Sequence, residues 1–176
     1  MIISEIELFK GIDFEVMNKI AKICSEESYS KGIVLFRNNE KAESLYIIIE
    51  GTVYLEVKNG GTITYSLNDP GEVFGWSSMF ESGRYTATGI CATDLKVVKI
   101  ERNRINKIFS IHPDAGIKIL RRLGTVFSNR LSNAYRDLLS ARSSVSGPAI
   151  WMNENIISNA PEEPFFDVPD NWHAQV

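Results

Sequence analysis

The stretch 28–100 consists of short strand-like segments separated by turn signals, and in 52–58 and 62–67 apolar and polar residues alternate. Alternation with a period of two is typical of a β-strand with one buried face. Asn59-Gly60-Gly61 joins two of these segments in the manner of a hairpin turn. The expected strands are 33–36, 45–50, 52–58, 62–67, 85–90 and 95–100. Six or more short strands separated by turns predict a barrel or jelly roll.

Helical spacing flanks this stretch on both sides. Before it, Asp13 is a good N-cap for an amphipathic helix over 14–25. After it, a short helix is expected over 102–110 and a long one over about 113–142, with Pro113 at its start. The predicted fold class is therefore mainly β with flanking helices, a double-stranded β-helix (jelly-roll) barrel with an N-terminal helix and a long C-terminal dimerisation helix.

Two apolar stripes run along the expected long helix. One recurs at alternating spacings of three and four residues, which is the pattern of a coiled-coil seam. Its members are Ile117, Leu120, Gly124, Phe127, Leu131, Ala134 and Leu138. The second stripe, Ile119, Leu123 and Val126, is expected to face the barrel. One stripe would be satisfied by packing within the chain, whereas two stripes need two surfaces, so we expect a parallel homodimer through this helix.

Charge is unevenly distributed along the chain. All 19 Lys and Arg lie at or before Arg142, whereas five acidic residues follow it. We therefore expect a domain over 1–142 and an acidic, aromatic C-terminal tail over 143–176, which packs back on this chain or on its partner. Neither part has the strongly basic character of a nucleic-acid-binding protein, so no nucleic acid is expected as a partner.

Several other classes of protein are disfavoured by what the chain lacks. The longest apolar run, 45–49, is far shorter than the ~20 residues that cross a membrane, and the first residues do not resemble an export signal. A cytoplasmic protein without membrane contact is expected. Cys24, Cys91, His112 and His173 are scattered, so no metal site is predicted. No catalytic set of residues is grouped in the sequence, and we do not expect an enzyme.

The order of these elements resembles the cyclic-nucleotide-binding domain, the family of the bacterial catabolite activator protein and of the regulatory subunits of protein kinase A. The resemblance covers about residues 5–142. The residues that carry it are Lys31-Gly32 with Leu35-Phe36, Tyr46 ahead of Gly51-Thr52-Val53, Pro70-Gly71-Glu72-Val73-Phe74-Gly75, and Tyr85-Thr86-Ala87. The prolines after residue 147 leave room for only one further helix, so the expected module stands alone without a helix-turn-helix.

The resemblance implies a phosphate-binding cassette that starts at Gly75 and holds cyclic AMP, cyclic GMP or another small phosphorylated ligand. The ligand-binding residues that it implies are Gly75, Trp76, Ser77, Ser78, Arg84, Tyr85, Thr86 and Ala87. In the family, a glutamate after the second glycine accepts the ribose 2′-hydroxyl, and an Arg directly precedes the Ser/Thr-Ala pair. Here Trp76 and Tyr85 hold those two places, and Arg84 lies one residue earlier.

Two functions remain open at this point. The first is a small-molecule-sensing regulatory module of the cyclic-nucleotide-binding type with a divergent cassette, in which the hinge near Ser110 reorients the long helix. The second is a degenerate, non-binding barrel that acts as a dimeric protein-interaction or scaffold module. Trp76 either plugs the pocket or stacks on a ligand. The helix face with Asn129, Arg130 and Asn133 is expected to lie in solvent rather than to cover a base.

Overall fold

The structure of the chain is a computed structural model that describes residues 3–58 and 61–143. Its packing divides the chain into two units, 1–132 and 133–176. Tail 143–176 lies almost wholly outside the described residues, so the predicted domain boundary at 142 stays a prediction. The helical elements are η1 (Ile3–Glu5), η2 (Glu7–Phe9), α1 (Phe14–Ile23), η3 (Trp76–Met79), α2 (Arg102–Ile111) and α3 (Pro113–Ser143).

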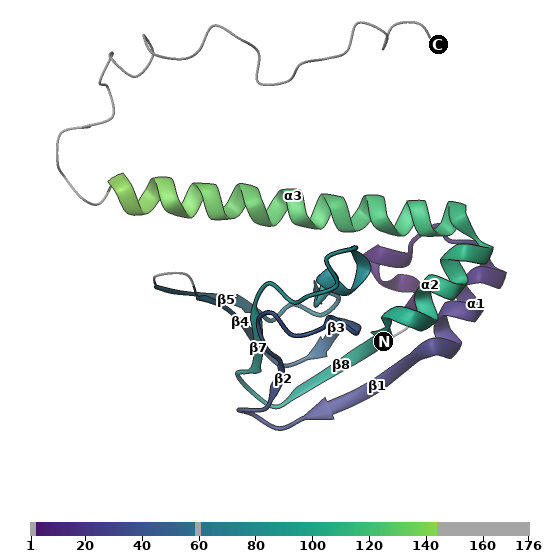
Figure 1. Cartoon of the computed structure of the whole chain (residues 1–176), viewed down its shortest axis with the longest axis horizontal. Helices are drawn as coiled ribbons and strands as arrows, with labels where there is room; N and C mark the ends of the chain where they lie inside the picture. Colours follow the sequence, from purple (N-terminus) through teal and green to yellow (C-terminus); the bar gives the residue numbers. More distant parts are fainter. Residues whose placement is uncertain (1–2, 59–60, 144–176) are drawn as a thin grey trace, which may run out of the picture. The chain divides into compact units, whose positions relative to one another are not determined.

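The strands form two four-stranded antiparallel sheets that face each other (Figure 1). The strand orders are β1-β8-β3-β6 and β2-β7-β4-β5. This arrangement confirms the predicted jelly-roll class, although the two sheets do not close into a barrel. The strands are β1 (Cys24–Tyr29), β2 (Val34–Phe36), β3 (Ser44–Glu50), β4 (Val53–Lys58), β5 (Thr62–Leu67), β6 (Val73–Phe74), β7 (Thr88–Cys91) and β8 (Leu95–Glu101).

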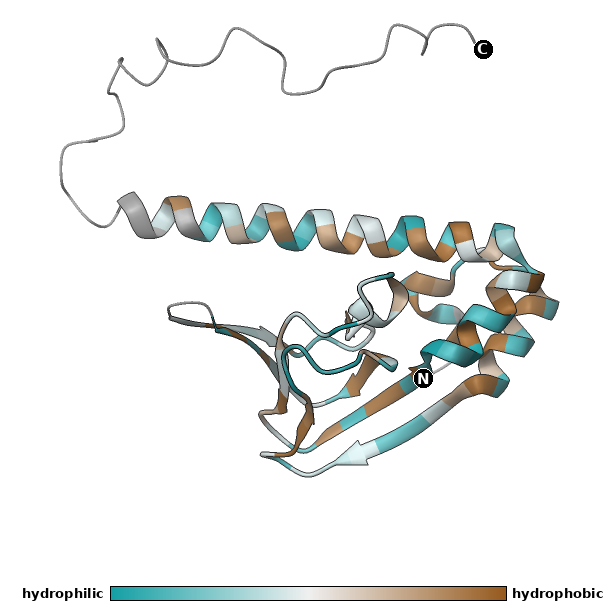
Figure 2. Ribbon diagram, viewed as in Figure 1, coloured by the Kyte–Doolittle hydropathy of each residue, from teal (hydrophilic) through white to brown (hydrophobic). Residues whose placement is uncertain are grey.

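Strand β3 separates two hydrophobic cores because its successive side chains point to opposite faces of the sheet. Leu45 and Ile47 belong to the core formed with the helices, whereas Tyr46 and Ile48 belong to the core between the two sheets. Figure 2 shows the corresponding hydrophobic segments in β3 and β8. The two-faced strand explains why its sequence is almost continuously apolar instead of alternating.

The structure differs from the sequence-based expectation at the start of the β region and before β7. The first helix ends at Ile23 rather than near residue 25, and Cys24 begins β1, whose residues pair with β8 from Cys24↔Ile100 to Tyr29↔Leu95. Tyr85 precedes β7, which starts at Thr88. Pairing with β8 outweighs the weak local helical signal at residues 24–25, because strand formation depends on the neighbouring strand.

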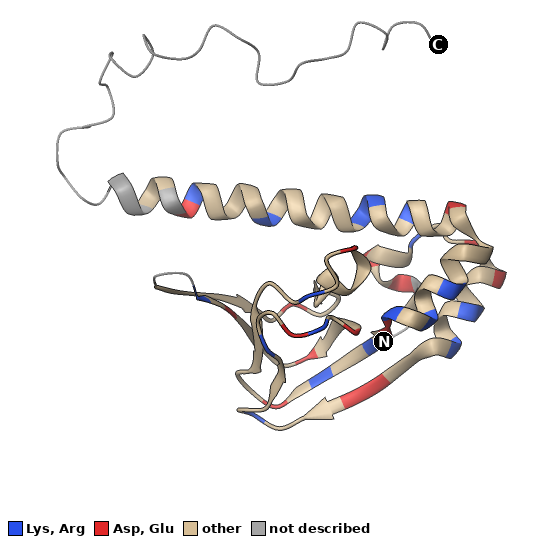
Figure 3. Cartoon of the chain, in the orientation of Figure 1, with Lys and Arg blue, Asp and Glu red and all other residues tan. Residues whose placement is uncertain are grey.

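The first part of α3 packs on the helical core. Ile119 and Leu123 are almost completely buried in this core, which confirms that they face the domain, whereas Val126 is only half-buried. Asp13 occupies the N-cap position of α1 but makes no side-chain capping hydrogen bond. Lys and Arg are frequent on α1, α2 and the first turns of α3 (Figure 3). No helix among the described residues is long and apolar enough to cross a membrane.

Candidate functional site

The candidate site starts at Gly75, where β6 turns into the short helix η3. Gly75 has a φ of +71°, and its carbonyl accepts a hydrogen bond from the Ser78 N–H at 3.1 Å. A Cβ atom at this position would lie 2.8 Å from the Ser44 carbonyl oxygen and 3.0 Å from the Tyr46 ring. Only glycine fits both this backbone conformation and this space. The predicted tight turn of the cassette is therefore present.

Trp76, the first residue of η3, is covered by side chains of α3. The Phe127 ring contacts it edge-on, with ring centroids 4.5 Å apart, and the Arg130 guanidinium carbon lies 4.4 Å from the centroid of the indole ring. The Arg130 distance is that of a cation–π interaction. We call Trp76, Phe127 and Arg130 the Trp76 clamp, because together they join the cassette to the long helix.

Arg130 is held by further contacts to the cassette. Its Nη2 donates a hydrogen bond to the Val73 carbonyl at 2.7 Å, and the same nitrogen lies 3.8 Å from a Glu72 carboxylate oxygen. Burial lowers the pKa of Arg130, while the Glu72 carboxylate and Tyr65 oppose that shift. The sequence favoured an exposed helix face for Arg130, and this was wrong because the side chain is only 16% exposed. Asn129 and Asn133 are exposed.

Two buried polar atoms in this region lack a hydrogen-bond partner. They are the hydroxyl oxygen of Ser78 and the Nη1 nitrogen of Arg130. Buried polar side chains are nearly always hydrogen-bonded in native proteins. These two atoms therefore mark the cassette region as a place where a further polar group would be stabilising.

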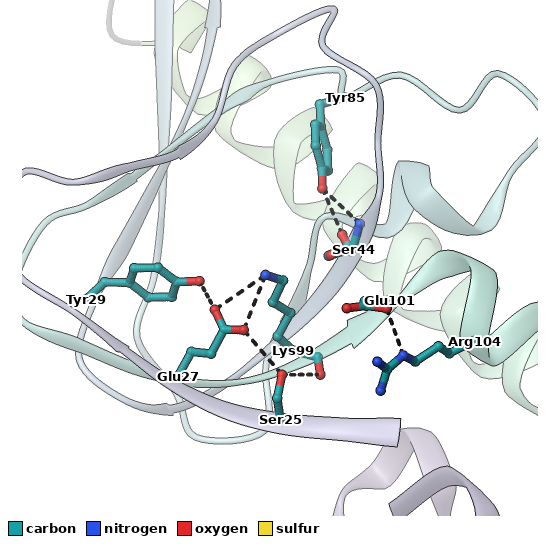
Figure 4. A network of polar contacts seen from close by, with 8 residues as sticks. All are labelled: Ser25, Glu27, Tyr29, Ser44, Tyr85, Lys99, Glu101 and Arg104. Carbon is teal, nitrogen blue, oxygen red and sulfur yellow. Dashed lines mark hydrogen bonds and ion pairs between the residues drawn. The ribbon is translucent and has the colours of Figure 1, made fainter. Parts of the chain in front are cut away.

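Tyr85 lies inside the core between the two sheets instead of at a ligand-facing edge. Its hydroxyl donates to the Ser44 carbonyl at 3.0 Å and accepts from the Ser44 N–H at 3.1 Å (Figure 4). Its ring stacks on Phe36 with centroids 3.9 Å apart. Burial raises the pKa of Tyr85, so the hydroxyl stays neutral and keeps both bonds. Phe36 and Tyr46 also stack, and Tyr46 stacks on Phe74.

The remaining implied ligand residues lie in different environments. Ser77 and Ser78 are buried in η3, Ala87 is half-buried, and Thr86 is exposed. Arg84 is exposed, and its Nη1 donates to the Asn39 carbonyl at 2.7 Å. The structure thus brings residues 75–78 together with α3, whereas Arg84 is bonded to a surface loop.

A second polar cluster lies on β1 and β8 (Figure 4). The Glu27 carboxylate accepts hydrogen bonds from the Tyr29 hydroxyl and the Ser25 hydroxyl, and the Lys99 ammonium lies 3.2 Å from it. Burial raises the pKa of Glu27, but the bonds from Tyr29 and Lys99 outweigh it and leave that pKa lowered. These contacts join β1 to β8. Among the described residues, no group of three or more His, Cys, Asp or Glu side chains could hold a metal ion.

The predicted dimer seam is largely an exposed apolar face. Ile117, Leu120 and Leu131 are 50%, 38% and 52% exposed, and Gly124 has open space where a side chain would lie. Phe127 departs from the expectation, because it packs on Trp76 of its own chain. Ala134 is half-buried, and the side chain of Leu138 lies outside the described residues.

Sequence reasoning missed the clamp, although a signal for it exists. Leu123, Phe127 and Arg130 follow one another at spacings of four and three, so Arg130 continues the buried side of α3. A charged residue in such a position indicates a specific partner. Here the partner is the ring of Trp76.

Comparison with known proteins identifies the fold and its relatives. Residues 26–112 match the family model described as "Cyclic nucleotide-binding domain". The chain is 24% identical over 140 residues to a CRP-like cAMP-activated global transcriptional regulator of Mycobacterium tuberculosis. The match covers 78% of this chain and 62% of the relative. This chain therefore spans somewhat more than half the length of that relative. A weaker similarity, over 22% of the relative's length, is to Glutaminase 2 of Bradyrhizobium diazoefficiens.

Two solved structures have the same fold. One, from Geobacter metallireducens GS-15, is named for cyclic nucleotide binding and has a TM-score of 0.64 and 28% identity over 71% of this chain and 92% of its own. The other is the regulatory subunit of a cAMP-independent protein kinase A from Trypanosoma brucei. Its TM-score is 0.59 at 22% identity, and the match covers 70% of this chain and 43% of that one.

Proposed function

Because residues 26–112 form a domain of the cyclic-nucleotide-binding family, we propose that this chain is a regulatory module whose long helix is joined to the cassette by the Trp76 clamp rather than by a bound cyclic nucleotide. The observation that carries the proposal is the contact of Phe127 and Arg130 with Trp76. The role is regulatory rather than catalytic.

The clamp occupies the place at which a nucleotide would meet the helix. In the family that this chain resembles, the residue after the second glycine accepts the ribose hydroxyl. The indole of Trp76 carries one donor and no acceptor, so it cannot replace that carboxylate. Its ring is already covered by Arg130, which forms its other bonds to the Val73 carbonyl and to Glu72. A sugar would have to displace these contacts.

The phosphate side of the site lacks its usual cation as well. Tyr85 stands where the family places its Arg, and its hydroxyl is engaged by both backbone groups of Ser44. Arg84 donates to Asn39 instead. The relative in fold from Trypanosoma brucei is described as the regulatory subunit of a cAMP-independent protein kinase A, so a protein of this fold can be regulated without cyclic AMP.

We propose that α3 pairs with the α3 of a second copy and that regulation is transmitted through this helix. Ile117, Leu120 and Leu131 form an exposed apolar stripe, and at Gly124, between Leu120 and Leu131, a Cβ atom would point into open space. Burial of such a stripe against an identical helix removes apolar area from water, and glycine allows the helices to approach closely. The clamp holds the same helix to its own domain through Phe127, which belongs to the heptad pattern, and through Arg130.

A second candidate is a sensor of a small anion other than a cyclic nucleotide. The unpartnered Ser78 hydroxyl and Arg130 Nη1 favour it, since an anion can accept hydrogen bonds from both kinds of donor. In that case Arg130 would leave the Trp76 ring when the anion binds.

Isothermal titration with cyclic AMP, cyclic GMP and inorganic phosphate tests both candidates. For the wild-type protein we expect no binding of any of the three up to millimolar concentration, and the same for Trp76→Glu because Tyr85 remains in place. Micromolar binding of a cyclic nucleotide to the wild-type protein would refute the proposal. Binding of phosphate that disappears in Arg130→Met would favour the anion sensor instead.

A further inference from the structure

Helices α1 and α2, which pack together at the helical end of the domain, both expose apolar and basic side chains. Phe14 is 79% exposed and Ile111 is 70% exposed, although both are large hydrophobic residues. Arg104, Lys107 and Ile111 follow one another at spacings of three and four, so they share one face of α2. We call Phe14, Lys22, Arg104, Lys107 and Ile111 the helix-end patch.

The two helices of this patch are held together. They pack against each other, and the Lys19 ammonium lies 2.8 Å from the Nε2 atom of His112, directly after α2. The patch is therefore a surface of the folded domain, with its side chains presented from two mutually supported helices.

Basic residues outnumber acidic ones on and beside α2, although Glu15 on α1 is exposed as well. From Arg102 to Arg122 the chain has six basic residues and one acidic residue, Asp114. The basic residues are Arg102, Arg104, Lys107, Lys118, Arg121 and Arg122. Figure 3 shows them on α2 and the first turns of α3. Within the described chain, Lys22 and Lys107 form no ion pair, whereas Arg104 pairs with Glu101 at 2.8 Å.

The same chain contains a segment of opposite character. Residues 149–176 have five carboxylates, four large aromatic residues and no Lys or Arg. The carboxylates are those of Glu154, Glu162, Glu163, Asp167 and Asp170, and the aromatic residues are Trp151, Phe165, Phe166 and Trp172. Charge and apolar character both complement the helix-end patch.

Chain length allows this segment to reach the patch. Helix α3 begins two residues after α2 ends and spans about 46 Å over its length. The residues after Ser143 can extend to about 110 Å. The segment therefore has more than enough length to return past the start of α3.

We propose that residues 149–176 dock on the helix-end patch, with carboxylates against Lys22, Arg104 and Lys107 and with aromatic rings against Phe14 and Ile111. This assignment is independent of the proposed function, because none of these patch residues belongs to the Trp76 clamp. It gives the acidic segment a binding surface on the helices that precede and begin α3.

Zero-length carbodiimide cross-linking of the full-length protein, read by mass spectrometry, tests the docking. Carboxylates of 154–170 should cross-link to Lys22 and Lys107 far more than to Lys31 and Lys58, which are equally exposed but lie in the β region. Equal cross-linking to all four lysines, or none to Lys22 and Lys107, would overturn the proposal.

A protease measurement checks the same contact with matched variants. Glutamyl endopeptidase should cleave after Glu154, Glu162 and Glu163 several-fold faster in an Arg104→Glu/Lys107→Glu protein than in the wild type. The control, Lys31→Glu/Lys58→Glu, carries the same change of charge and should be cleaved at the wild-type rate. If both variants are cleaved equally fast, the patch does not hold the segment. Cleavage within the β region serves as the internal measure of folding.

Discussion

Trp76 and Arg130 depend on each other. A guanidinium that is only 16% exposed has lost much of its hydration, and Arg130 regains stabilisation from the Trp76 ring, the Val73 carbonyl and the Glu72 carboxylate. Without the Trp76 ring the buried Arg130 guanidinium loses a stabilising contact, and without Arg130 the Trp76 ring loses the group that covers it. The pair is therefore expected to be coupled energetically rather than additive.

A double-mutant cycle measures that coupling. Arg130→Met and Trp76→Leu should each destabilise the protein, and the double variant should lose less than the sum, with a coupling of about 1 kcal/mol. Urea unfolding followed by circular dichroism gives the free energies. Losses that add within error would show that the cation–π contact contributes nothing.

The tight turn at Gly75 is expected to depend on the absence of a side chain. Gly75→Ala should cost about 1–3 kcal/mol in the free energy of unfolding, because alanine at a φ of +71° would also press on the Ser44 carbonyl. Gly61→Ala is the matched control, since its φ is not in the left-handed region and nothing lies within 4 Å of its Cβ position. A loss of equal size in both variants would contradict the account.

At the scale of the elements, the sequence predicted what depends on local periodicity. The strands around 45–50, 62–67 and 95–100 lie where short apolar or alternating segments between turns predicted them, and the long helix starts at Pro113 as its helical spacing predicted. The start of β1 at Cys24 was missed, because it depends on pairing with β8. The clamp was missed for a similar reason, since Arg130 is buried only by a residue far away in sequence.

The exposed apolar stripe of helix α3 is expected to form the dimer interface. Leu120→Glu/Leu131→Glu should convert a dimer into a monomer, because it places charge in the exposed apolar stripe while it leaves the buried residues Ile119 and Leu123 unchanged. Size-exclusion chromatography with light scattering reads the mass. Ile63→Glu, at an exposed apolar position on β5, is the control and should stay dimeric. A monomeric wild-type protein would refute the dimer.

In the whole domain, one strand borders both hydrophobic cores and one clamp joins the cassette to the long helix. Strand β3 has Leu45 and Ile47 in the core with the helices and Tyr46 and Ile48 in the core between the sheets. The Trp76 clamp adds a direct contact between the cassette and α3. If the clamp does what a nucleotide does elsewhere, α3 is already ordered on the domain without any ligand.

Hydrogen exchange of the α3 amides over 119–132 tests this claim most directly. In the wild-type protein we expect slow exchange that cyclic AMP at saturating concentration leaves unchanged, whereas Trp76→Ala should exchange markedly faster in this segment. The amides of β3 and β8 should stay protected in both proteins and report that the fold is intact. Fast exchange in the wild-type protein that slows when cyclic AMP is added, or no acceleration in Trp76→Ala, would contradict the account.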